Sequence, residues 1–489
     1  MTERAPFSFE HTFVDRLAGF GAPWEPTEVP APNLLKLNTT LATELGLDPR
    51  RLTTEDGVRI LAGAATPAEA SPIAQVYAGH QFGSYNPQLG DGRAVLLGEI
   101  VAPDGQRYDV ALKGSGRTPF SRGGDGKAAL APVLREYLMG EAMHALGVPT
   151  TRALAAVTTG ELIRRDGMAP GAVLTRVASS HLRVGTFQFF SARGDTDRLR
   201  RLVDYSIDRH DPDLAHVDNP PLALVDAVIG RQAALIARWM NLGFIHGVMN
   251  TDNVTISGET IDYGPCAFMD AYDPRTVFSS IDHGGRYAYG NQPTIGLWNM
   301  ARLAEALLPL IDDDQERAVE LATHTLDTYQ SRYDEAWLAG MRTKLGIERA
   351  DDAAGDRALA NDWLELLERH RVDVTTAFRR LAEAADGELA SRVGVTSLFD
   401  DDIADWLDRW SRRRAPGAAD GMRRANPVYV PRNHLVEAAL EAATAGDMAP
   451  FDELLDVVTS PYAEQAGRER FAQPAPDDFT NTYRTFCGT

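Results

Sequence analysis

One stretch, GFIHGVMNTDNVTISGETIDYG at residues 243–264, constrains the fold more than any other part of the chain. It follows an apolar helical pattern at 222–242. Within it, VTISGETID (254–262) predicts a tight hairpin, because two short β-prone runs flank a Gly-Glu turn. A hairpin brings its ends together, so we expect Asn253 and Asp262 to face one point. An amide oxygen beside a carboxylate suits Mg²⁺ that bridges phosphates. The alternative is a structural hairpin whose acids are solvated.

The spacing within this stretch resembles two protein-kinase motifs. His246, Gly247 and Asn253 match the catalytic-loop pattern H-[RG]-D-x-x-x-x-N, and the tripeptide DYG at 262–264 resembles the metal-binding D-[FY]-G. One position departs from the pattern, since Val248 stands where kinases have the catalytic Asp. Another carboxylate, Asp252, directly precedes Asn253. The pattern predicts a phosphate and metal site with an altered base.

An earlier part of the chain contains residues that could form a second kinase feature, an ion pair between a strand Lys and a helix Glu. RAVLLGEIVAPDGQRYDVALKG (93–114) predicts a strand, a turn and a second strand, and 127–147 predicts a helix. Lys113 ends the second strand on the face opposite its apolar neighbours, and Glu136 lies on the helix. A strand Lys paired with a helix Glu holds a phosphate-binding ammonium in kinases. A solvated Lys at a strand end is the alternative.

Two glycine-rich segments flank these strands. In QLGDGR (88–93), Gly90 and Gly92 permit a close approach of backbone to phosphate, and Arg93 adds charge. In GSGRTPFSRGGDGK (114–127), Asp125 and Gly126 stand just before the predicted helix, whose first N–H groups could hold an anion. Each segment could equally be a flexible linker.

Two arginines occur in an apolar context. LTRVASSHLRVGTFQFF (174–190) contains Arg176 and Arg183, seven residues apart. Buried guanidinium groups need anionic partners. Either a bound anionic ligand or internal salt bridges would satisfy them.

The composition of the chain indicates which kinds of binding partner and which cellular location to expect. The 489 residues carry 49 Lys and Arg against 69 Asp and Glu, a formal net charge of -20, which disfavours nucleic acid and anionic membranes as partners. We expect no membrane-spanning segment and no N-terminal targeting signal. Cys266 and Cys487 are the only cysteines, so a disulfide framework is excluded, and the cytoplasm is the expected location.

The order of patterns predicts an α+β fold. A helical pattern at 34–47 precedes the strands, and further helices are predicted at 222–242, 293–311, 314–343, 358–386, 401–413 and 433–457. We therefore expect a protein-kinase-like, two-lobed fold with a sheet-rich N-lobe and a larger helical C-lobe. The predicted parts are an N-terminal extension (1–76), the N-lobe (77–175), the C-lobe (176–400) and a C-terminal helical extension (401–489).

Longer strings of the sequence resemble the selenoprotein O family, also called YdiU. They are YAGHQFGSYNPQLGDGRAVLLGE (77–99), ALKGSGRTPFSRGGDGKAAL (111–130), LREYLMGEAMHALGVPTTRAL (134–154), RVASSHLRVGTFQFF (176–190), HGVMNTDNVTISGETIDYGPCAFMD (246–270) and NQPTIGLWNMARLAEALLPL (291–310). The resemblance extends from LLKLN at residue 34 to the segment 426–440, so it covers nearly the whole chain. The segment before it matches the family only loosely.

The resemblance implies a function. The family's members are pseudokinases that transfer AMP from ATP to Ser, Thr or Tyr hydroxyls of proteins and bind ATP in a flipped orientation. By that resemblance, Asn253 and Asp262 would hold Mg²⁺ or Mn²⁺, and Asp252 would accept the hydroxyl proton. The ATP-binding residues would be Gly90, Gly92, Arg93, Lys113, Asp125, Gly126, Arg176, Arg183 and Asp262, with Lys113 and Glu136 as an ion pair. Partners would be ATP and protein substrates, the enzyme itself among the candidates.

The C-terminal tail departs from the family pattern. Many relatives end in a cysteine or selenocysteine motif with a partner residue close by, whereas RTFCGT has Cys487 alone. Cys266 follows the Asp262 loop, so a Cys266–Cys487 disulfide could restrain that loop under oxidation. Two reduced cysteines are the alternative.

Two other functions share most of these features. A conventional phosphotransferase acting on a protein or small molecule would use the same metal site, with Asp252 as its base. A non-catalytic ATP-binding scaffold would need no complete metal site. The target proteins, the preferred hydroxyl, the metal used in the cell and the oligomeric state do not follow from the sequence.

Overall fold

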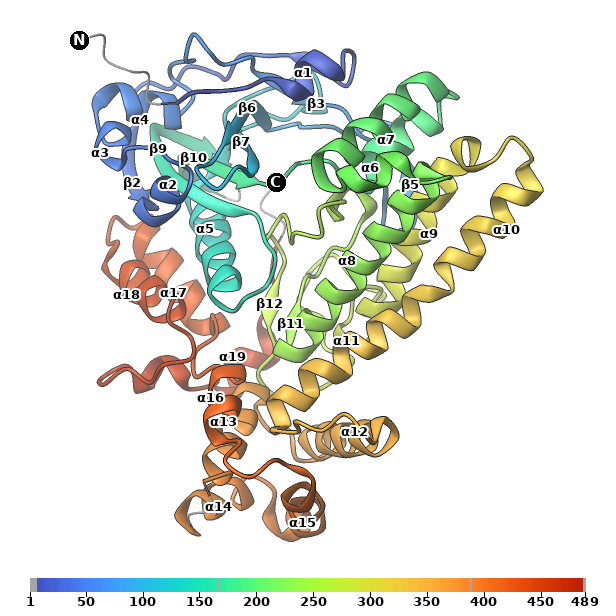
Figure 1. Cartoon of the computed structure of the whole chain (residues 1–489). Helices are drawn as coiled ribbons and strands as arrows, with labels where there is room; N and C mark the ends of the chain where they lie inside the picture. Colours follow the sequence, from blue (N-terminus) through green and yellow to red (C-terminus); the bar gives the residue numbers. More distant parts are fainter. Residues whose placement is uncertain (1–6, 166, 387–388, 487–489) are drawn as a thin grey trace.

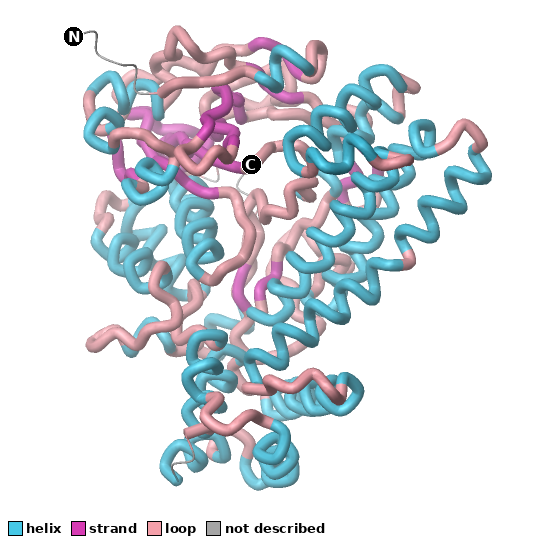
Figure 2. Tube along the Cα trace, viewed as in Figure 1, coloured by secondary structure: helices cyan, strands magenta, loops and turns pink. Residues whose placement is uncertain are grey.

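The chain folds as an α+β protein in which one antiparallel sheet precedes a long series of helices (Figures 1 and 2), which confirms the predicted fold class at this level. The computed structural model describes residues 7–165, 167–386 and 389–486. The main sheet has the order β1-β3-β6-β7-β10-β9-β2, with β8 beside β10. The strands are β1 Gly21–Pro23, β2 Asn33–Leu37, β3 Ile73–Gln75, β4 Gly79–Gln81, β5 Ser84–Asn86, β6 Ala94–Val101, β7 Arg107–Lys113, β8 Ala128–Ala129, β9 Arg152–Arg164, β10 Met168–Ala178, β11 Phe244–Ile245 and β12 Ala267–Phe268.

The predicted hairpin at 93–114 is present as β6 and β7. Their register pairs Ala94 with Lys113 and Val101 with Arg107. Val110 and Leu112 are fully buried in one apolar cluster beneath the N-terminal helices. Lys113 is on the opposite face, as the alternation of side chains along a strand requires.

The helix predicted at 34–47 is wrong in its first half. Asn33–Leu37 forms β2, which pairs with β9, and only Thr39–Glu44 is helical as α2. Asn38 separates the two because its Oδ1 accepts the Leu41 N–H at 3.0 Å, an N-cap. Pairing with an edge of the sheet overrides the local helical pattern.

One helix, α5 (Leu130–Ala145), connects the sheet to the C-terminal helices. Leu134, Leu138 and Ala142 are fully buried and lie against β9 and β10. Its other side packs against α17 and α18, where the Tyr137 ring meets the Phe451 ring edge-on, with 6.4 Å between the ring centroids. Figure 1 shows the red C-terminal helices beside α5.

The predicted helices are present, but three are interrupted. The 314–343 pattern forms α10 and α11, 358–386 forms α12 and α13, and 433–457 forms α17 and α18. Arg371, with φ 52°, ends α12 in the left-handed region, and Gly446, with φ 99°, follows α17. The helices are α1 Thr12–Arg16, α2 Thr39–Glu44, α3 Pro49–Leu52, α4 Glu55–Leu61, α5 Leu130–Ala145, α6 Val184–Ser191, α7 Thr196–His210, α8 Pro220–Leu242, α9 Gln292–Ile311, α10 Gln315–Leu326, α11 Thr328–Leu345, α12 Ala353–His370, α13 Val374–Ala384, α14 Leu389–Thr396, α15 Ala404–Arg413, α16 Ala419–Ala425, α17 Asn433–Thr444, α18 Ala449–Val458 and α19 Asp477–Thr482.

Helix α8 is apolar over much of its length. Among the described residues it is the one helix long and apolar enough to cross a membrane by length and composition, contrary to the expectation that no such stretch exists. It packs between α9 and α11, and Val225, Val228 and Ile229 are fully buried there. A helix that is apolar on most sides is accounted for by this central position.

Candidate nucleotide-binding and catalytic site

The sheet, the two glycine-rich segments and the loop 248–265 enclose a cavity of about 1120 Å³. Its size suits a nucleotide-sized ligand. Eight of its lining residues are Lys or Arg and five are Asp or Glu, whereas the chain as a whole has a net charge of -20. The cavity is therefore a local basic site in an acidic protein, which favours an anionic ligand.

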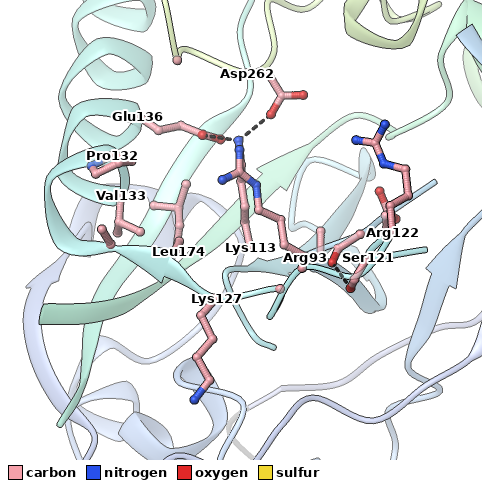
Figure 3. A pocket seen from close by; sticks show the side chains of 18 of the residues that line it. Arg93, Lys113, Ser121, Arg122, Lys127, Pro132, Val133, Glu136, Leu174 and Asp262 are labelled. Atoms are coloured by element: carbon pink, nitrogen blue, oxygen red, sulfur yellow. Dashed lines mark hydrogen bonds and ion pairs between the residues drawn. The ribbon is translucent and has the colours of Figure 1, made fainter. Parts of the chain in front are cut away.

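Lys113 lies at the centre of the charged groups in this cavity. Its Nζ is 2.5 Å from Glu136 Oε2 and 2.5 Å from Asp262 Oδ1, as Figure 3 shows. Burial opposes ionisation of the Asp262 carboxyl, but Lys113 and then Arg176 hold its pKa well below the usual range. The predicted pairing of Lys113 with Glu136 is thus present, and it is part of a larger cluster of charged side chains that includes Asp262, the candidate metal ligand.

Arg176 satisfies its charge inside the protein. Its Nη1 donates to Glu136 Oε1 at 3.3 Å and to Asp262 Oδ1 at 3.1 Å. Its Nε donates to His181 Nε2 at 3.2 Å, which requires that ring nitrogen to be unprotonated. Burial lowers the His181 pKa, in agreement with a neutral ring.

Arg183 is less completely paired. Its guanidinium lies over the Tyr77 ring at 4.5 Å, and its nearest carboxylate oxygen, on Asp91, is 4.0 Å away. The side chain is buried, and its Nε has no hydrogen-bond partner in the described structure. A buried unpaired donor that lines a cavity is suited to an anionic ligand.

The hairpin predicted at 254–262 is wrong, although its ends do reach one cavity. The residues on the two sides of the turn at 256–257 pair with other segments instead of each other. Thr255 forms an isolated antiparallel bridge with Arg183, and Thr260 a parallel bridge with Thr150. Asn253 and Asp262 nevertheless both line the cavity.

Asn253 and Asp262 each have one oxygen suitable for a cation. The Asn253 Nδ2 donates to the Val248 carbonyl at 3.1 Å, which leaves Oδ1 as the free acceptor. Lys113 and Arg176 both bind Oδ1 of Asp262, so Oδ2 is available. Within the described ranges, no three His, Cys, Asp or Glu side chains are grouped to hold a metal ion. A divalent cation bound by Asn253 and Asp262 would therefore need phosphate oxygens of the nucleotide as further ligands.

Backbone strain is concentrated around the cavity. Among the described residues, the non-glycine residues with positive φ are Phe82, Arg122, Asp262 and Arg371, and the first three line the cavity. Such conformations cost about 1–3 kcal/mol each and persist where surrounding contacts enforce them. Asp262 has a φ of 64°, and Lys113 and Arg176 both bind its carboxylate.

Asp252 is a buried carboxylate on the cavity wall. Its Oδ2 accepts from Gln81 Nε2 at 3.2 Å, while its Oδ1 has no partner in the described structure. Burial raises the pKa of this carboxyl to about 6. Gly79 makes room for it, because a Cβ there would lie 2.6 Å from Oδ1. An unpaired carboxylate oxygen can accept a proton.

The glycine-rich segments form one wall of the cavity, and their glycines are explained by packing. Gly90 has φ 109°, and a Cβ there would lie 2.6 Å from the Phe120 ring. At Gly92 a Cβ would meet the Phe120 carbonyl at 2.9 Å. At Gly126, with φ 69°, it would meet the Gly116 carbonyl at 2.1 Å, so this glycine closes the base of the second segment. Arg93 also lines the cavity.

Asp125 lines the cavity but is already paired with another residue. It forms a bidentate pair with Arg165, with both contacts at 3.0 Å, and the hydrogen bond from Arg165 lowers its pKa. Nothing in the sequence pattern of 114–127 indicates this partner, which is contributed by the β9–β10 connection.

Several lining residues were not singled out from the sequence. Arg122, Arg164 and Arg165 add positive charge, Tyr77 stacks on Arg183, and Gln81 binds Asp252. Arg122 stands within the second glycine-rich segment, so a count of cations there would have found it. Tyr77 and Gln81 lie within the family-like string 77–99, but no pattern there marked them as site residues, and Arg164 and Arg165 lie outside every string that was singled out.

A basic cavity between a sheet and a helical region, lined by the amide of Asn253 and the carboxylate of Asp262, is the arrangement expected of a nucleotide-dependent transferase. The chain matches the model of the family described as "Protein adenylyltransferase SelO" over residues 4–459. It belongs to this SelO/YdiU family.

Curated relatives match along their whole length. A protein named "Protein nucleotidyltransferase YdiU" from Cereibacter sphaeroides is 61% identical over 486 residues, covering 99% of this chain and 100% of the relative. Proteins of the same name from Mycobacterium sp. (strain KMS) and Mycolicibacterium smegmatis are 56% and 55% identical, over 484 and 493 residues. They cover 99% and 100% of this chain, and 99% and 100% of the relatives.

Proposed function

We propose that this protein transfers AMP from ATP to Ser, Thr or Tyr hydroxyls of proteins and releases pyrophosphate. Membership of the SelO/YdiU family supports nucleotidyl transfer as the reaction. The observation that carries the proposal is the placement of Asp252. It gives the cavity a buried carboxylate with an unpaired oxygen, whereas the kinase-type position, Val248, is buried and apolar.

The proposed step forms one bond and breaks one. The acceptor hydroxyl oxygen bonds to the α-phosphorus, the bond from that phosphorus to the bridging oxygen of the β-phosphate breaks, and pyrophosphate leaves. Asp252 Oδ1 takes the hydroxyl proton. Lys113, Arg176 and Arg183 hold the triphosphate and stabilise the charge on the leaving group.

The proposed ATP orientation is flipped relative to kinases, with the α-phosphorus beside Asn253 and Asp262. Arg183 supports it, because its guanidinium is buried and incompletely paired. Lys113 and Arg176 also line the cavity, where they would bind the triphosphate beside their carboxylate partners Glu136 and Asp262. Gly90, Gly92, Arg93, Asp125 and Gly126 would line the rest of the ATP site. A Mg²⁺ or Mn²⁺ ion held by Asn253 and Asp262 would neutralise phosphate charge.

Three further expectations belong to this proposal. The sheet with α5 would correspond to a kinase-like N-lobe and the helical region to a C-lobe. The working location would be the cytoplasm. Nucleic acid and membranes would not be partners, because the net charge is strongly negative.

Mass spectrometry of the protein after incubation with ATP and Mn²⁺ tests the reaction class. Self-modification with an AMP adduct supports the proposal, and a phosphate adduct would identify a phosphotransferase instead. Asp252→Asn is the control, since it preserves side-chain size while it removes the base.

A further inference from the structure

Three of the apolar side chains that line the cavity together with Asp252 are contributed by the loop after β4, the segment 278–281 and the C-terminal segment. They are Phe82, Ile281 and Phe486, and all three line the same cavity as the proposed base. Ile281 is 47% exposed and Phe486 is 72% exposed, the latter being the most exposed large apolar residue of the described ranges. Exposed apolar groups that cluster at a cavity mark an interaction site more often than scattered ones do.

The segments that present Ile281 and Phe486 are held side by side. The Ser280 N–H donates to the Thr485 carbonyl at 2.9 Å, and the Thr485 N–H donates to the Phe278 carbonyl at 2.8 Å. Ile281 and Phe486 each directly follow a residue of this pairing. Thr485 Oγ1 also donates to the Pro265 carbonyl at 2.7 Å, which ties the pairing to the loop that carries Asp262. These contacts therefore hold the segments of Ile281 and Phe486 next to the loop that carries Asp262.

Phe82 is linked to the loop that carries the base. Its N–H donates to Asn250 Oδ1 at 3.0 Å, and the Tyr287 hydroxyl donates to the same oxygen at 2.6 Å. The Phe82 ring contacts the Tyr287 ring at 5.1 Å between centroids. Its backbone has a φ of 50°, which these contacts maintain. Because Asn250 precedes Asp252 by two residues, Phe82 is positioned relative to the base.

We infer that Phe82, Ile281 and Phe486, here called the apolar rim, bind the substrate protein through a large apolar side chain that neighbours its acceptor hydroxyl. This inference rests on the proposed function, which requires an acceptor segment to reach Asp252. An acceptor segment in the cavity passes the apolar rim, and an apolar neighbour of its hydroxyl removes the exposed Ile281 and Phe486 surface from water. The partner is thus an extended protein segment with an apolar residue beside its Ser, Thr or Tyr.

A pair of synthetic peptides tests the inference. Both contain one central Ser, flanked in one peptide by Leu and Phe and in the other by Gly and Asn. With α-labelled ATP and Mn²⁺, we expect the wild-type kcat/KM to favour the apolar-flanked peptide by about tenfold or more, the range typical for an apolar side chain in a pocket.

Variants test whether the apolar rim causes the preference for the apolar-flanked peptide. In the Ile281→Ser/Phe486→Ser double variant, the ratio of the two kcat/KM values should fall to within about twofold, whatever happens to the overall rate. Val319→Ser is the matched control, since Val319 is 45% exposed on α10 and does not line the cavity. It should retain the wild-type ratio.

Other outcomes overturn the inference. Equal labelling of the two peptides by the wild type, or self-labelling with neither peptide labelled, contradicts it while the proposed function stands. A dimeric wild type that becomes monomeric in the double variant would assign the apolar rim to contacts between copies of the chain. Absence of α-label from peptides and enzyme alike would refute the proposed function and this inference with it.

Discussion

Replacing Asp252 with Asn should make the enzyme slower and more stable at once. Burial raises the pKa of the Asp252 carboxyl from 3.8 to about 6. The unfolded chain releases this proton at lower pH than the native protein does. Above pH 6 the native carboxylate therefore carries a penalty of about 3 kcal/mol, which falls to about half by pH 5 and vanishes below 3.8.

The amide removes this penalty but introduces a smaller one. Asn keeps an acceptor for Gln81 Nε2, while its NH₂ takes the place of the oxygen that has no partner. An unpaired buried donor costs about 1–2 kcal/mol. The net expectation for metal-free Asp252→Asn is an unfolding free energy about 1–2 kcal/mol above that of the wild type at pH 8, with the gain lost at pH 5.

Urea unfolding at the two pH values measures the stability change, and AMP incorporation into protein measures the rate. Removal of the base should lower kcat by about 10²–10⁴-fold. Asp125→Asn is the stability control, because the hydrogen bond from Arg165 lowers its pKa and the side chain is half exposed. It should lose less than about 1 kcal/mol at pH 8. The reasoning is refuted if Asp252→Asn keeps a tenth of the wild-type kcat, or is less stable than the wild type at pH 8.

Three further changes have distinct expected results. Lys113→Ala leaves Asp262 with one of its two cations, so the unfolding free energy should fall by about 3 kcal/mol, and calorimetry should show weaker ATP binding. Gly90→Ala forces a Cβ into the Phe120 ring at a φ of 109°, and should cost about 1–3 kcal/mol by urea unfolding. The Cys266 thiol is buried, and burial raises its pKa to about 12, so iodoacetamide at pH 8 should label it only after denaturation, as peptide mass spectrometry would show.

Local patterns predicted the parts of the site whose geometry follows from single elements. The alternation along 107–113 placed Lys113 on the correct face, and the helical period placed Glu136 within reach of it. The expected hairpin, together with the kinase-like spacing, indicated that Asn253 and Asp262 share a site. The structure brings both to one cavity through a loop anchored by Arg183 and Thr150, where a hairpin was expected.

The remaining features depend on contacts between segments far apart in the chain. β2 pairs with β9 more than a hundred residues away, which overrides the helical pattern at its position. Asp125 is paired with Arg165, and Gln81 binds Asp252, yet no sequence pattern links either pair. The Cys266–Cys487 disulfide stays untested, because Cys487 lies outside the described residues. Single-sequence patterns carry little information on such long-range pairs.

The most direct test of AMP transfer uses the purified protein with Mn²⁺ or Mg²⁺ and ATP labelled at the α- or the γ-phosphate. Autoradiography then shows which label becomes bound to protein, with Asp262→Ala as the control that removes a proposed metal ligand. The account predicts label from the α-phosphate alone, lost in Asp262→Ala. Label from the γ-phosphate alone would contradict it, since it would identify a kinase and leave the proposed roles of Arg176 and Arg183 without support.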